Sequence, residues 1–298
     1  MANETARGIV KSDPAKNARA GEKFKFSFER FSHDKESKSG DLDQWDYFGS
    51  ALIGLRFEDA DGHVADGSAI LVSPGIAISA KHVIDERLKN LMSSFTKVMA
   101  FSIIGDNKIL IWDVQEVMLG DTDVAILRLD LRSDFPKDGI VCAKITTRTP
   151  TIGEQVMFAG VKGISKVCTG EPAPAQVRVG VGEVTALYLE GRDSVMNPHP
   201  CIEVKCLTLG GMSGGPAFDK DGHLVGILTS SFEHELGPSY CSLWWPMANH
   251  AIGSTWLTGS VTLPTNLLQL NAAGLARIIG PEAISLHSDG SFNFLIWN

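Results

Sequence analysis

Three polar side chains with the chemistry of acyl transfer stand in three short, widely separated segments of this chain. His82 belongs to the segment Ser-Ala-Lys-His-Val, Asp123 to Asp-Thr-Asp-Val-Ala-Ile-Leu, and Ser213 to Gly-Gly-Met-Ser-Gly-Gly-Pro. A serine hydroxyl is a weak nucleophile at neutral pH, so it needs a neutral imidazole to take its proton. We therefore interpret Ser213 as a nucleophile, His82 as its general base and Asp123 as the group that orients His82.

The surroundings of these residues favour that chemistry over simpler readings. Asp123 precedes an apolar run typical of a buried strand, where a carboxylate is costly unless it is hydrogen-bonded, and His82 would be its partner. Glycine tolerates positive φ, so the Ser213 turn can aim the amides of Gly211 and Ser213 at one point. A glycine-rich β-turn without chemistry is the alternative for this motif alone.

Two sets of short β-like runs, separated by turn residues, must position these side chains. Each set has the strand inventory of one small barrel. The first set comprises Ala51–Phe57, Gly67–Ser73, Ile76–Ser79, Val98–Ile104, Lys108–Val117 and Val124–Leu129. The second set comprises Glu154–Val161, Gln176–Val181, Val184–Leu189, Cys201–Leu207, Pro216–Phe218, Leu224–Ser230 and Tyr240–Trp245.

The two ends of the chain differ from this pattern. Residues 1–44 are polar and predict an arm or linker, with one short alternating strand at 24–28. Helical spacing of leucine and isoleucine over 265–279 predicts a helix with Thr265 as its N-cap, and residues 291–298 predict an added strand or docking tail. The expected units are therefore 1–44, an N-terminal barrel at 45–135, a C-terminal barrel at 136–262, and the helix and tail at 263–298.

Composition narrows the function classes. The chain has 298 residues and a formal net charge of −8, which argues against a nucleic-acid partner because phosphate binding needs a basic face. It has no apolar run long enough to cross a membrane and no apolar segment near residue 1, so we expect neither a membrane partner nor export. The 5 cysteines show no paired spacing, which favours a reducing, cytoplasmic compartment.

Taken together, the three segments resemble those of the trypsin/chymotrypsin-like serine proteases, in particular bacterial members, over roughly residues 49–250. The resemblance implies an all-β protein with two six-stranded antiparallel β-barrels and a C-terminal helix, and no PDZ domain is apparent. It implies a serine endopeptidase that needs no cofactor and whose partner is a protein or peptide substrate. By the same resemblance, Gly211 and Ser213 form the oxyanion hole, Asp123 rather than Asp121 is the triad acid, and Thr229 hydrogen-bonds that acid.

Two positions depart from the family pattern. Lys81 stands where relatives carry alanine, which is tolerable if its side chain points to solvent. Met212 stands where zymogen-activated relatives carry an aspartate that pairs with a newly cut N-terminus. Methionine cannot make that ion pair, so activation in the pancreatic manner is not expected.

The resemblance places the primary substrate pocket at Leu207, Thr208, Ser230 and Ser231. Because no carboxylate stands at the pocket base, we expect cleavage after small or medium uncharged side chains. Glu233 and Glu235 remain alternatives that could attract a basic side chain from the next loop. Recognition of an acidic side chain through Thr208 and Ser231 is the other alternative.

Other functions stay open at this point. A catalytically silent scaffold could hold a peptide in the same place, and a latent enzyme could wait for a regulatory protein partner. A zinc site would have to combine the residues His199, Cys201, Cys206 and Cys241. Their spacings match no common zinc pattern, so no metal is expected.

Overall fold

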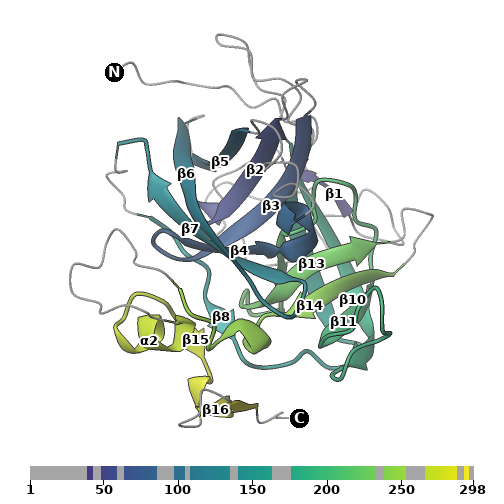
Figure 1. Ribbon diagram of the computed structural model, residues 1–298. Helices are drawn as coiled ribbons and strands as arrows, with labels where there is room; N and C mark the ends of the chain where they lie inside the picture. Colours follow the sequence, from purple (N-terminus) through teal and green to yellow (C-terminus); the bar gives the residue numbers. More distant parts are fainter. Residues whose placement is uncertain are drawn as a thin grey trace.

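Strands form almost all of the regular structure in the part of the chain that the computed structural model describes (Figure 1). The described residues are 39–42, 48–58, 64–85, 97–104, 108–134, 140–162, 176–231, 238–252, 266–286 and 292–294. The sheets confirm the predicted class, an all-β protein with two six-stranded antiparallel barrels. The strand expected at 24–28 lies outside the described residues.

The first barrel closes in the order β2-β3-β4-β7-β6-β5. Its strands are β2 (Leu52–Glu58), β3 (Val64–Ser73), β4 (Ile76–Ala80), β5 (Lys97–Ile104), β6 (Lys108–Leu119) and β7 (Val124–Leu131). Antiparallel pairing of β5 with β2 completes the ring. Branched and aromatic side chains such as Ile53, Ile78, Trp112 and Ile126 are fully buried, so the apolar runs in the sequence became the barrel core.

The second barrel closes in the order β12-β9-β10-β11-β14-β13, with β13 pairing back to β12. Its strands are β9 (Gln155–Lys162), β10 (Gln176–Tyr188), β11 (Cys201–Lys205), β12 (Pro216–Phe218), β13 (Leu224–Ser231) and β14 (Ser239–Leu243). The two runs expected at 176–181 and 184–189 form one strand, β10. It stays extended because residues up to Glu183 pair with β9 and residues from Glu183 onward pair with β11.

Three short strands extend the second sheet. The strand β1 (Ser39–Leu42) pairs with β10 along Val177–Gly180, so the end of the predicted N-terminal arm contributes a strand. The strand β8 (Ile145–Thr146) runs parallel to the start of β13. The strand β15 (Ile278–Ile279) lies parallel to β8 on its other side.

The C-terminal helix is shorter than predicted. The helix α2 spans only Leu267–Ala272, and its N-cap is Asn266 rather than Thr265, with a capping box between Asn266 and Gln269. The expectation of a helix to residue 279 is wrong because Ile278–Ile279 pairs with β8. The apolar residues at 278–279, whose spacing suggested a helix, are therefore apolar because they belong to a buried sheet. The added strand expected near the C-terminus is confirmed as β17 (Phe292–Phe294), which pairs with β16 (Ile284–Leu286).

The two barrels share one of the two buried apolar clusters found among the described residues. A single cluster of buried apolar side chains includes Ile70 of β3 together with Val161 of β9. The strand β9 packs against β2 and β3, and β13 packs against β4. None of the helices in the described residues is long and apolar enough to cross a membrane.

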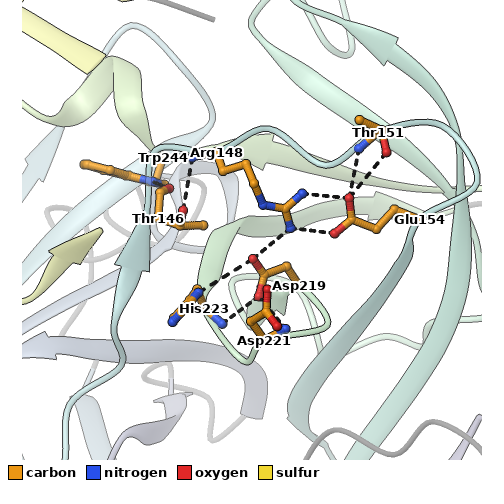
Figure 2. A network of polar contacts seen from close by, with 8 residues as sticks. All are labelled: Thr146, Arg148, Thr151, Glu154, Asp219, Asp221, His223 and Trp244. Carbon is orange, nitrogen blue, oxygen red and sulfur yellow. Dashed lines mark hydrogen bonds and ion pairs between the residues drawn. The ribbon is translucent and has the colours of Figure 1, made fainter. Parts of the chain in front are cut away.

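A network of charged side chains fixes the chain where β12 ends (Figure 2). The Arg148 guanidinium donates to both carboxylate oxygens of Glu154, at 2.7 and 2.5 Å, and to Asp219 Oδ2 at 2.9 Å. Asp219 is fully buried, and its other oxygen accepts from the amides of Asp221 and His223. Buried charge is tolerated here because every carboxylate oxygen of Asp219 has a donor.

Candidate active site

His82 and Asp123 are joined by two hydrogen bonds. His82 lies in the helical residues 81–85 that follow β4, and Asp123 immediately precedes β7. The imidazole Nδ1 lies 2.7 Å from Asp123 Oδ2, and the backbone amide of His82 donates to Asp123 Oδ1 at 2.9 Å. One carboxylate therefore holds both the ring and the main chain of His82. Because β4 pairs with β7, the sheet itself brings the two segments together.

Lys81 reinforces this junction. Its ammonium donates to the carbonyl of Gly120 at 2.7 Å, and its amide donates to the carbonyl of Asp123 at 3.2 Å. The side chain is half-buried and bound to the loop that carries Asp123. The departure from alanine thus adds a contact between the histidine and aspartate segments, which differs from the expected solvent-facing lysine.

The Ser213 turn has the conformation that its glycines permit. Gly211 has φ = 88° and Gly214 has φ = 84°, values that strain any residue with a side chain. Among the described residues, the amides of Met212, Gly214 and Gly215 each donate to a backbone carbonyl, whereas those of Gly211 and Ser213 donate to none. An oxyanion hole requires two neighbouring N–H groups that donate to no other acceptor, and one turn offers two such amides here.

Ser68 ties this turn to the first barrel. Its amide donates to the Ser213 carbonyl at 2.9 Å, and its hydroxyl donates to the Gly211 carbonyl at 2.9 Å. The same hydroxyl accepts from the Val161 amide at 2.8 Å, while Ser79 donates to the Ser68 carbonyl at 2.7 Å. Both serines are fully buried. They were missed from the sequence, although a serine inside an apolar strand is a signal that a buried partner must exist.

These contacts bring the turn close to the histidine segment. A Cβ atom at Gly214 would lie 2.1 Å from the Ser68 carbonyl oxygen and 3.1 Å from the Ala80 amide nitrogen. A Cβ atom at Gly67 would meet Val83, the neighbour of His82, at 2.4 Å and the Ser213 carbonyl oxygen at 3.8 Å. The Ser213 turn therefore packs against the end of β4, next to the helical residues that carry His82.

Met212 fills the core beneath the turn. Its side chain is fully buried and belongs to the apolar cluster of the second barrel that includes Phe158 and Leu228. Its sulfur accepts from the amide of Leu209 at 3.4 Å. The expectation that a freed N-terminus does not set this turn stays a prediction, and the buried thioether gives a physical reason for it.

Thr229 is buried in β13, as its expected supporting role requires. Its hydroxyl donates to the carbonyl of Tyr240 at 3.3 Å and accepts from Ser242 at 3.5 Å. A hydroxyl has one proton to donate, and here that proton serves the neighbouring strand. In the structure Thr229 therefore donates to Tyr240, and the expected hydrogen bond from Thr229 to Asp123 is not formed.

The expected pocket residues lie just after β11 and at the end of β13. Leu207 is half-buried and Thr208 is buried, two and three residues after β11, while Ser230 and Ser231 end β13. Glu233 and Glu235, the alternative carboxylates, lie outside the described residues. The pocket assignment stays a prediction.

A second histidine lies within electrostatic reach of Asp123. His199 is buried, and its Nε2 lies 2.6 Å from the Ser242 hydroxyl. Burial lowers the pKa of His199, while the negative charges of Asp123 and Asp193 oppose that effect. A buried imidazole with a lowered pKa is neutral at neutral pH, so His199 itself adds no positive charge near Asp123.

In the described residues, one group of three side chains has the spacing of metal ligands, namely Asp219, Asp221 and His223. The buried carboxylate of Asp219 is already bound by the Arg148 guanidinium and by two amides. A cation there would meet the fixed positive charge of Arg148, so the cluster is explained by the turn that it closes.

Comparison with known proteins agrees with the motifs. Residues 67–227 match the family model described as a trypsin-like peptidase domain. No protein with a curated description matches the sequence significantly.

Three solved structures are similar to this chain, and two of them are proteases by their descriptions. Deg5 is 16% identical, with a TM-score of 0.49, over 66% of this chain and 85% of that one. The Rv3671c protease from M. tuberculosis in its active form is 16% identical, with a TM-score of 0.47, over 74% and 85%. The serine endoprotease from Yersinia pestis is 20% identical, with a TM-score of 0.45, over 66% and 60%.

Proposed function

Because the chain belongs to the trypsin-like peptidase domain family, we propose that it is a serine endopeptidase that cleaves peptide bonds through Ser213, His82 and Asp123. The observation that carries this proposal is the pair of hydrogen bonds from His82 to Asp123, at 2.7 Å from the ring and 2.9 Å from the amide. A histidine that only supports the fold would not need a carboxylate partner for both its ring and its backbone amide.

The geometry supports a defined tautomer for His82. A carboxylate only accepts hydrogen bonds, so His82 Nδ1 carries the proton and donates it in a hydrogen bond to Asp123 Oδ2, which leaves the lone pair of Nε2 free to act as a base. In the proposed reaction, His82 takes the Ser213 proton as the hydroxyl attacks the substrate carbonyl. His82 then returns that proton to the leaving amine, and water hydrolyses the acyl-enzyme by the reverse sequence.

The oxyanion of each tetrahedral intermediate would accept from the amides of Gly211 and Ser213. Among the described residues, neither amide donates to a backbone carbonyl. The turn that holds them is fixed by the Ser68 hydrogen bonds and by the buried side chain of Met212. Because such amides already point at the oxyanion, they need not move when negative charge develops on the substrate oxygen. No step of this reaction uses a metal or another cofactor.

We also propose that the enzyme works in a reducing, cytoplasmic setting on protein or peptide substrates, under control of a protein partner. The four described cysteines, Cys142, Cys201, Cys206 and Cys241, are all free thiols. The net charge of −8 gives no support to a nucleic-acid partner.

The function is tested by incubating the full chain with a mixed library of unstructured peptides and identifying the cleaved bonds by mass spectrometry. We expect cleavage by the native protein and none by Ser213→Ala of unchanged circular dichroism. Cleavage that persists in Ser213→Ala would assign the activity to another group. No cleavage by either protein, with a folded chain, would favour the silent peptide-binding scaffold.

A further inference from the structure

A short loop, residues 120–123, carries Asp123 between β6 and β7, and we call it the acid loop. Where it meets β7 it is held by the sheet, because Ala80 of β4 pairs with Val124. Where it leaves β6, Gly120 belongs to no strand, and no backbone amide among the described residues donates to its carbonyl. The start of the acid loop therefore depends on other groups to hold it in place.

Lys81 supplies the donor that the Gly120 carbonyl needs. The ammonium nitrogen lies 2.7 Å from that carbonyl oxygen. Hydrogen bonds from a charged donor are stronger than those between neutral groups. Gly120 is buried and Lys81 is half-buried, so this bond is partly protected from competition with water. One side chain thus ties the start of the acid loop to the residue that precedes His82.

A residue of the second barrel packs against the same glycine. A Cβ atom at Gly120 would lie 2.0 Å from the sulfur of Met247. Met247 is buried in the 3₁₀ helix η3 (Trp245–Met247), which follows β14. Gly120 is therefore fixed twice, by a hydrogen bond from the segment that carries His82 and by packing from the other barrel.

The support that Asp123 was expected to receive from a hydroxyl group is missing. Thr229 donates its proton to the Tyr240 carbonyl at 3.3 Å instead. Among the described residues, both hydrogen bonds to the Asp123 carboxylate come from His82. Lys81 stands where the family pattern has alanine, and a methyl group cannot donate a hydrogen bond. The bond from Lys81 to Gly120 is therefore an addition in this chain, at a site where the expected support is lost.

We propose that Lys81 is a positioning residue for the reaction, because its bond to the Gly120 carbonyl clamps the acid loop and keeps the Asp123 carboxylate aligned with the His82 ring. This inference rests on the proposed endopeptidase function and adds a residue to its machinery. Lys81 acts through Asp123 and touches neither the substrate nor the reacting atoms.

Such a role makes a specific kinetic prediction. An error of about 1 Å in the placement of a catalytic group lowers the rate by up to about 100-fold. Because the clamp makes no contact with the peptide, its loss should lower kcat and leave KM unchanged. We expect kcat of Lys81→Met on a peptide cleaved by the native chain to fall about tenfold, with circular dichroism unchanged.

A spectroscopic signature tests the clamp without any substrate. The proton that His82 Nδ1 donates to Asp123 Oδ2 should give a ¹H NMR resonance far downfield, which is assigned by its absence in His82→Ala. In Lys81→Met this resonance should move upfield and broaden, because a looser acid loop lengthens the bond and admits water. If exchange with water hides the resonance in the native chain, the split between kcat and KM decides alone.

Arg128→Met is the matched control. It removes a cation from the same pair of strands, where Arg128 of β7 donates to Glu116 of β6, but it leaves the acid loop untouched. It should change neither kcat nor the resonance. If Lys81→Met does not fold, Lys81→Ala replaces it, since alanine is the residue of the family pattern and equally lacks a donor.

Failure of this inference is distinguishable from failure of the proposed function. A native chain that cleaves peptides, with kcat or the resonance unchanged in the Lys81 variant, would remain a serine endopeptidase and would remove Lys81 from its machinery. A folded native chain that cleaves no peptide, but whose resonance is lost in the Lys81 variant, would contradict the function and leave the clamp in place.

Discussion

At the scale of single residues, the site depends on how many partners each functional group has. Asp123 accepts from both the ring and the amide of His82, so it determines the imidazole tautomer as well as its position. The Gly211 and Ser213 amides are available because their neighbours, rather than they, form the internal hydrogen bonds of the turn.

Replacing Asp123 with asparagine tests the tautomer directly. The asparagine oxygen would keep the hydrogen bond from the His82 amide, which places the NH₂ group opposite Nδ1. An NH₂ group only donates, so the imidazole would carry its proton on Nε2 and lose its function as a base. We expect kcat on a peptide substrate to fall by about 10⁴-fold while the fold survives. A loss smaller than about tenfold would show that Asp123 does not orient the base.

Ser68→Ala tests the attachment of the nucleophile turn. The substitution leaves the Gly211 carbonyl and the Val161 amide without their buried partner. We expect a loss of about 2 kcal/mol in the free energy of unfolding, measured with urea, and a lower kcat at unchanged KM. The exposed Thr185→Ala, which removes a bond to Glu203, is the control and should change neither quantity. A stability loss without any change in kcat would mean that Ser68 supports the fold alone.

At the scale of elements, local signals were enough for the strands and for the three motifs. The runs before His82 and after Asp123 became β4 and β7, whose pairing joins the two residues. Long-range partners could not be predicted. The sequence around Ser68 does not indicate a contact with Gly211, and the sequence around Ser239 does not indicate a contact with Thr208. The length of the C-terminal helix was overestimated for the same reason. An apolar residue at position 278 suits a helix, but Ile278 instead pairs with Ile145 in a sheet.

The network around Arg148 predicts a response to acid at the end of β12. Burial raises the pKa of Glu154, but the hydrogen bonds from Arg148 and from the Thr151 amide, together with the positive charges of Arg148 and Lys220, outweigh burial and leave that pKa below its ordinary value. A lowered folded pKa means that Glu154 contributes stability fully above the unfolded value of about 4.3, and that this stability is lost as the pH falls through the lower, folded pKa. Urea unfolding of the native chain and of Glu154→Gln between pH 7 and pH 3 should show the two stabilities converging at the acid end. Parallel curves would contradict the assignment.

Arg148→Met tests the same network at neutral pH. It leaves the carboxylate of Asp219, which is fully buried, with two amide donors and no cation. We expect a loss of about 3 kcal/mol in the free energy of unfolding. Arg132→Met, which removes an ion pair between exposed groups with Asp113, is the control and should cost little. Equal losses in the two variants would mean that burial of Asp219 is not what makes Arg148 important.

At the scale of the whole molecule, the first barrel contributes His82 and Asp123 and the second contributes Ser213. The barrels are joined by a common apolar core and by the serine contacts at β3. Two buried thiols lie in or directly after β11 of the second barrel: burial raises the pKa of Cys206 to about 12 and that of Cys201 to about 11. Such thiols are protonated and unreactive at neutral pH.

The thiol state therefore predicts activity without disulfides. The folded chain should cleave peptides equally well with and without a thiol reductant, and its buried cysteines should react with iodoacetamide only after unfolding. A peptide mass map of the native protein should contain no disulfide among Cys142, Cys201, Cys206 and Cys241. Two or more native disulfides, or loss of activity in reductant, would contradict the reducing setting.

The central claim is that Ser213 is a nucleophile activated by His82, and covalent labelling of the intact protein tests it most directly. A fluorophosphonate probe reacts with a serine only when a base and an oxyanion hole activate it. Intact-mass spectrometry of the full chain should show one adduct per molecule, located on Ser213 by peptide mapping. The adduct should be absent in Ser213→Ala and formed far more slowly in His82→Ala. No adduct on a folded native chain, or an adduct on another serine, would contradict the account.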